Sequence, residues 1–75
     1  MASTYSIVEP LDPQTGMTLI SVTGPATVAA GGHQIYVSAA GVTTPADLLT
    51  RYQNVADQVE NSFAERAAVA AQLNP

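Results

Sequence analysis

The sequence of 75 residues contains no cysteine and no lysine, and only eight side chains carry a formal charge, six acidic and two basic. Without cysteine, the chain has neither disulfide bonds nor thiolate metal sites. A single histidine, His33, cannot build a transition-metal site within one chain. Small domains usually depend on disulfide bonds, a bound metal or a partner chain for stability. We therefore expect this chain to gain stability from a partner.

The shortage of basic residues also excludes classes of partner. Two arginines, a net charge of −4 and a pI near 4.3 leave no patch that could neutralise phosphates or hold a helix on a membrane surface. There is no apolar run of about 18 residues, and the N-terminus lacks the pattern of a signal peptide. We therefore expect no nucleic-acid or membrane partner, and a chain made in the cytoplasm whose mature form begins near Ala2.

The length allows a single small domain over residues 1–75, and its character changes at Thr44-Pro45. Residues 1–43 favour strands and turns, and no formal charge occurs from Pro13 to Ala46. Residues 44–75 favour one helix. The predicted fold class is α+β, with short antiparallel strands over about 5–38 and one long amphipathic helix over about 45–73.

The strand-forming half contains two well-bounded strands and a glycine turn. Residues 5–9 and 17–23 read as strands, each ended by proline or glycine. Residues 27–30 and 33–37 flank Gly31-Gly32, and two glycines can supply the positive φ angles of a two-residue hairpin. In that hairpin Val28 would face Ile35 and Thr27 would face Tyr36, whereas the alternative is a flexible glycine-rich loop.

The helix has a clear start and no interior breaker. Thr44 can act as the N-cap, Pro45 suits the first helical position, and the Asp47 carboxylate complements the helix dipole. Neither glycine nor proline occurs from Ala46 to Asn74. At 1.5 Å per residue, such a helix is roughly 40 Å long.

Residues of the helix separate into an apolar stripe and a polar face when they are placed at 100° steps. We expect the stripe to be an interface, formed by Leu48, Tyr52, Val55, Val59, Phe63, Arg66 and Leu73. On the opposite face, Asp57, Glu60 and Glu65 are expected to be solvated. A helix of this length overhangs a sheet only about 20 Å long, so copies of the helix or another protein should cover the stripe.

Arg66 interrupts the stripe near its centre, and besides a catalytic or anion-binding role two interpretations are open. Its aliphatic stem could cover apolar surface while the guanidinium reaches solvent. Alternatively, its planar and permanently charged head could bind a carboxylate or carbonyl of a neighbouring chain.

The sequence offers little for catalysis. His33 is the only histidine, the side chain that most often acts as a general base near neutral pH, and its place beside a glycine turn is typical of a solvated residue. There is neither a nucleophile elbow nor a phosphate-binding glycine motif nor a calcium-binding loop. We therefore expect no catalytic residues, no bound cofactor and no metal.

In overall character, a tiny, cysteine-free chain with a charge-poor β-rich half and a long helix resembles the small virion proteins of tailed bacteriophages, such as capsid decoration or tail-associated subunits. The resemblance implies a non-enzymatic structural subunit located in the virion. Its partners would be copies of itself, possibly a trimer, and a larger structural protein packed against the uncharged half and the helix stripe. The alternative is a small cytosolic adaptor or regulator, antitoxin-like or chaperone-like, that dimerises or binds a partner through the helix.

Overall fold

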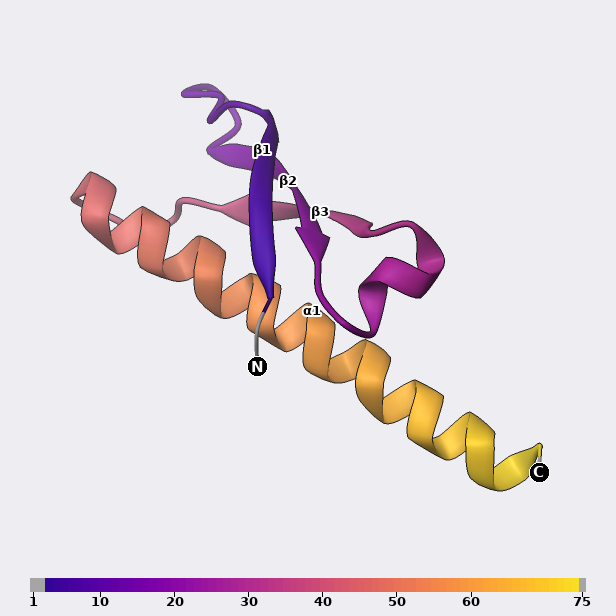
Figure 1. Ribbon diagram of the computed structural model, residues 1–75. Helices are drawn as coiled ribbons and strands as arrows, with labels where there is room; N and C mark the ends of the chain where they lie inside the picture. Colours follow the sequence, from indigo (N-terminus) through magenta and orange to yellow (C-terminus); the bar gives the residue numbers. More distant parts are fainter. Residues whose placement is uncertain (1–2, 75) are drawn as a thin grey trace.

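A computed structural model describes residues 3–74 as three strands followed by one long helix (Figure 1). The strands β1 (Thr4–Glu9), β2 (Met17–Thr23) and β3 (His33–Ser38) form one antiparallel sheet in the order β1-β2-β3. The helix α1 (Pro45–Leu73) crosses one face of this sheet and continues beyond it. The predicted α+β class is confirmed, and the expected start at Ala2 lies outside the described residues.

The core is a thin layer between β2 and α1. Ile20 and Val22 point from β2 toward the helix and are fully buried, and Val37 of β3 joins them. They pack with Tyr52 and Ala56 of α1. Because side chains alternate along a strand, the odd-numbered residues of β2 point to the opposite face of the sheet.

That opposite face is open, and it carries both polar and apolar side chains. Ser6 lies opposite Ser21, which lies opposite Gln34, and Ser6 and Gln34 are exposed. Tyr36, opposite Leu19, is 56% exposed at the other end of β3. No helix of residues 3–74 covers this face (Figure 1).

The helix begins and ends where the sequence predicts. The Thr44 side-chain oxygen accepts a hydrogen bond from the backbone N–H of Asp47, and Pro45 occupies the first turn. The last helical residue is Leu73, followed by Asn74 as the C-cap. The sequence is sufficient to predict this start because the Thr44 cap and Pro45 each act within the first turn of the helix.

The predicted hairpin around Gly31-Gly32 is wrong. Residues Thr27–Ala30 form a short 3₁₀ helix, η1, that ends at Gly31 with φ of 80°. β3 pairs with β2 instead, so Ile35 lies opposite Ile20 rather than Val28. Two influences outweigh the turn signal: the β-branched strand β2 offers a longer partner, and a distant carboxylate binds the start of η1.

Candidate interaction surface

The last part of α1 projects away from the rest of the chain (Figure 1). Every residue from Glu65 to Asn74 is exposed, whereas Tyr52, Ala56 and Glu60 are buried under the sheet and η1. We call residues 65–74 the C-terminal extension. Isolated helices of about ten residues are marginal in water, so this segment has few interactions of its own to hold it.

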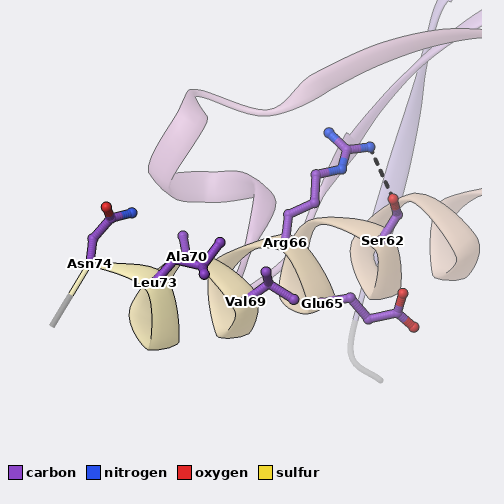
Figure 2. Close-up of a pocket in the computed structure, with 7 residues that line it drawn as sticks. All are labelled: Ser62, Glu65, Arg66, Val69, Ala70, Leu73 and Asn74. Atoms are coloured by element: carbon purple, nitrogen blue, oxygen red, sulfur yellow. Dashed lines mark hydrogen bonds between the residues drawn. The ribbon is translucent and has the colours of Figure 1, made fainter.

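One side of the C-terminal extension is apolar (Figure 2). Leu73 is 75% exposed and Val69 is 55% exposed. With the turn before them they border a shallow depression along the helix, lined by Ser62, Glu65, Arg66, Val69, Ala70, Leu73 and Asn74. Val69 and Leu73 lie one helical turn apart, so their exposed side chains form one apolar surface on this side of the helix.

The exposed apolar side formed by Val69 and Leu73 does not continue the line of helix residues that faces the sheet. At 100° per residue, Leu73 lies about 100° around the helix axis from Ala56. A partner seated on the stripe therefore approaches α1 from the side and does not replace the sheet. The chain's own fold and a docked partner can occupy the helix together.

Arg66 lies at the boundary between the extension and the folded body. Its Nη2 donates to the Ser62 hydroxyl at 2.9 Å, and its guanidinium carbon lies 5.0 Å from the centre of the Phe63 ring. The Phe63 ring in turn packs against His33, with 5.2 Å between ring centres. The stem therefore covers apolar surface while the exposed head keeps donors for a ligand, and contact with a neighbouring chain stays a prediction.

The structure divides the predicted interface stripe in two. Tyr52 is only 4% exposed, so it belongs to the chain's own core and is not an interface residue. Its hydroxyl shares a 2.7 Å hydrogen bond with Thr18, and its ring packs edge-on against Tyr5. Three further members are partly buried against that core, namely Leu48, Val55 and Val59. Arg66 and Leu73 stay exposed, and Phe63 lies between the two parts.

The expected solvation of Glu60 is wrong. Its carboxylate is fully buried and accepts hydrogen bonds from the backbone N–H of Ala26 at 2.7 Å and of Thr27 at 3.0 Å. The Thr27 hydroxyl donates a third, also at 3.0 Å. Burial raises the pKa of the Glu60 carboxyl, but these hydrogen bonds favour the ionised form more strongly and the net effect is a lowered pKa.

Asp57 is also less solvated than the sequence suggested. Its carboxylate accepts hydrogen bonds from the hydroxyl of Ser3 and from the side-chain amide of Gln53, and these lower the pKa of the Asp57 carboxyl. The Gln53 amide also donates to the backbone carbonyl of Ser3. This cluster attaches the start of β1 to the helix. Of the three predicted solvated acids, only Glu65 is exposed.

Sequence reasoning missed the place of Glu60 because its partners are about thirty residues away. One signal was present: Tyr52, Ala56 and Glu60 recur every four residues, which places them on one line of the helix. The predicted interface did not include Val69, although the structure leaves it as one of two large exposed apolar side chains of the extension.

The described residues contain no group of three or more His, Asp or Glu side chains that could hold a metal ion. None of the helices in residues 3–74 is long and apolar enough to cross a membrane. No protein-family model matches the chain, and neither a curated protein nor a solved structure matches it significantly.

Proposed function

We propose that this chain is a non-enzymatic structural subunit of a larger protein assembly, and that the C-terminal extension attaches it there. The observation that carries the proposal is the ten-residue exposed end of α1 with Val69 and Leu73 on one side. Burying apolar surface on a partner is worth about 25 cal/mol per Å². Attachment would also stabilise a helix end that its own chain leaves unsupported.

The charges of the extension suit a protein partner. Glu65 and Arg66 are its two charged residues, so residues 65–74 carry no net charge although the whole chain carries −4. Arg66 is well suited to bind a carboxylate or a carbonyl of the partner because a guanidinium offers several donors in one plane. The assembly that the sequence character favours is the virion of a tailed bacteriophage, as a decoration or tail-associated subunit.

The experiment compares matched pairs of substitutions on two sides of the extension. V69D/L73D places carboxylates on the apolar stripe, and A68D/A71D places the same charges on the other side. Both pairs disturb the helix end to a similar extent, because both put acids near its C-terminus. We expect the control pair to co-sediment with virions assembled in infected cells, and the stripe pair to stay in the supernatant.

Two results would contradict the proposal. One is equal incorporation of both pairs into particles, which would show that the stripe does not attach the chain. The other is recovery of the wild-type chain with a single small soluble protein and never with particles, which is the outcome expected of an adaptor.

A further inference from the structure

The two edges of the sheet differ in how they are protected. Natural edge strands avoid pairing with other chains by means of charges, prolines and bulges. β1 has such devices, since its register with β2 shifts between Ile7 and Glu9, Glu9 is charged, and Pro10 follows. β3 has none of them: its six residues carry no formal charge and no proline, and its register with β2 is unbroken.

Hydrogen bonds at the end of the sheet show which backbone groups of β3 face outward. The Ala39 N–H donates to the carbonyl of Gly16 at 2.8 Å, so the pair of residues 16 and 39 is a hydrogen-bonded one. Such pairs alternate along an antiparallel ladder. His33, Ile35 and Val37 therefore bond to β2, while the backbone groups of Gln34, Tyr36 and Ser38 point away from it.

Only part of this outer edge is occupied. The Ser38 carbonyl accepts a 2.9 Å hydrogen bond from Arg51. This bond agrees with the outward direction of the Ser38 carbonyl. Within residues 3–74, no hydrogen bond reaches the outward N–H or carbonyl of Gln34 or Tyr36. Gln34 and Tyr36 thus each offer an N–H donor and a carbonyl acceptor to another strand.

A depression beside this edge offers room for side chains. It lies between β3 and α1 and is lined by His33, Ile35, Gln58, Val59, Ser62, Phe63 and Arg66. Ile35 is partly buried against the core and borders the depression. A strand added at the edge would place alternate side chains on this side of the sheet.

We propose that a second copy of this chain occupies the β3 edge, with the two β3 strands antiparallel about a two-fold axis at Ile35. In this register Gln34 lies opposite the partner's Tyr36, and each such pair exchanges both backbone hydrogen bonds. Every free outward group of the two residues is then satisfied in both copies. The result is a continuous six-stranded sheet.

The same register suits the side chains. The two Ile35 residues form a non-hydrogen-bonded pair, in which the Cα atoms are about 4.5 Å apart and side chains are closest. They meet on the side of the depression, so apolar surface covers apolar surface. On the open face, Gln34 lies beside the partner's Tyr36, and an amide beside an aromatic ring is compatible there. Because β3 carries no formal charge, the net charge of −4 causes little repulsion at this edge.

This dimer is independent of the attachment proposed above. It uses β3 and leaves the C-terminal extension of each copy free, so the unit that would join an assembly is a dimer with two attachment helices. A foreign extended peptide could satisfy the hydrogen bonds of one copy. The two-fold register, by contrast, satisfies both edges at once and pairs identical apolar residues.

Charge substitutions on the open face test the register. Gln34 and Tyr36 are exposed there, so Q34K/Y36K and Q34E/Y36E should fold normally. Each variant would place like charges side by side across the two-fold axis. We expect sedimentation equilibrium to give a dimer, twice 7.7 kDa, for the wild type and a monomer for each variant alone. An equimolar mixture of the two variants should form a heterodimer.

The matched control is T4K/S6K, which adds the charges of Q34K/Y36K to the open face at the β1 edge. This control should remain a dimer.

Three results would overturn the β3 dimer: a wild-type monomer at NMR concentrations, a Q34K/Y36K variant that still dimerises, or variants that fail to pair when mixed. An intermolecular NOE between the Hα atoms of the two Ile35 residues, in a mixture of labelled and unlabelled chains, should be seen for the wild type, and a dimer without it would refute this register. V69D/L73D should remain a dimer even where it fails to join virions, so failure of either proposal is recognised separately.

Discussion

Glu60 and Thr27 are joined by two hydrogen bonds, because the buried carboxylate oxygen Oε1 accepts from both the backbone N–H and the hydroxyl of Thr27, each at 3.0 Å. The second oxygen accepts from Ala26. A carboxylate therefore binds the first N–H groups of η1 in the way that an anion binds a helix N-terminus. This contact ties the connection between β2 and β3 to the middle of α1.

Glu60→Gln should lower the free energy of unfolding at neutral pH, because an amide offers a single acceptor oxygen where the carboxylate offers two. The pKa of Glu60 is lowered in the folded state, so its contribution to stability is present above the unfolded-state pKa, about 4.3 for glutamate, and is lost as the pH falls further. The wild type should lose more stability than Glu60→Gln between about pH 6 and pH 3. Urea unfolding followed by circular dichroism measures this difference. Parallel pH profiles would contradict the role of Glu60, and Glu65→Gln serves as the exposed control.

Gly24→Ala should destabilise the chain through Glu60. A Cβ at position 24 would lie 2.7 Å from Cδ of Glu60, so the carboxylate could not keep its hydrogen bonds to η1. In a Glu60→Ala background the obstructing atoms are gone, and the same glycine substitution should cost much less. A double-mutant cycle of urea unfolding measures this coupling. Additive effects of the two substitutions would show that the close approach has no energetic consequence.

Tyr52→Phe should lower the free energy of unfolding by about 1–3 kcal/mol, because it leaves the buried Thr18 hydroxyl without a partner. The hydroxyls of Thr18 and Tyr52 are 2.7 Å apart, and both residues are nearly inaccessible to solvent. Replacing both polar groups in Thr18→Val/Tyr52→Phe should restore much of the loss, since no buried group is left unpaired. Thermal unfolding of the three variants tests this, and a double variant less stable than Tyr52→Phe would refute the explanation.

Arg51 should contribute mainly to the stability of the fold, and Arg66 mainly to attachment. Arg51 donates to the backbone carbonyls of Ser38 and Ala40, at 2.9 and 2.7 Å, and so connects the end of β3 to α1. Arg51→Ala should destabilise the fold by about 1 kcal/mol. Arg66→Ala should change stability by less than about 0.5 kcal/mol, as is usual for exposed positions, but should weaken attachment to virions more than Arg51→Ala does. Chemical unfolding and co-sedimentation separate the two effects. Equal effects on co-sedimentation would leave Arg66 only the role of covering Phe63.

A chain that ends at Ala64 should keep the fold of residues 3–63, because the C-terminal extension is exposed along its whole length. In the intact, unattached chain, amides of the extension should exchange with solvent faster than those of Tyr52 and Ala56, which lie under the sheet. Hydrogen exchange followed by NMR measures both chains. Slow exchange in the extension of the unattached chain would contradict this prediction.

The sequence by itself determined the elements whose signals are local. The strand at residues 17–23 follows from its β-branched residues and the Gly24-Pro25 break. The helix at residues 45–73 follows from the Thr44 cap, Pro45 and the absence of any interior breaker. The length of the helix also predicted that its end would extend beyond the sheet, because the sheet is made of short strands.

Only the tertiary structure decided how the polar groups are used. Glu60 looks like a solvated acid from its neighbours in the helix, yet Thr27, 33 residues away, makes it a buried ligand for η1. The same contact holds the start of a 3₁₀ turn at residues 27–30, where the sequence predicted a strand, and β3 pairs with β2 instead. β3 therefore has a free outer edge, because residues 27–30, its predicted partner, do not pair with it. A prediction from propensity and periodicity considers only residues that are close in the sequence, so it could not predict that edge.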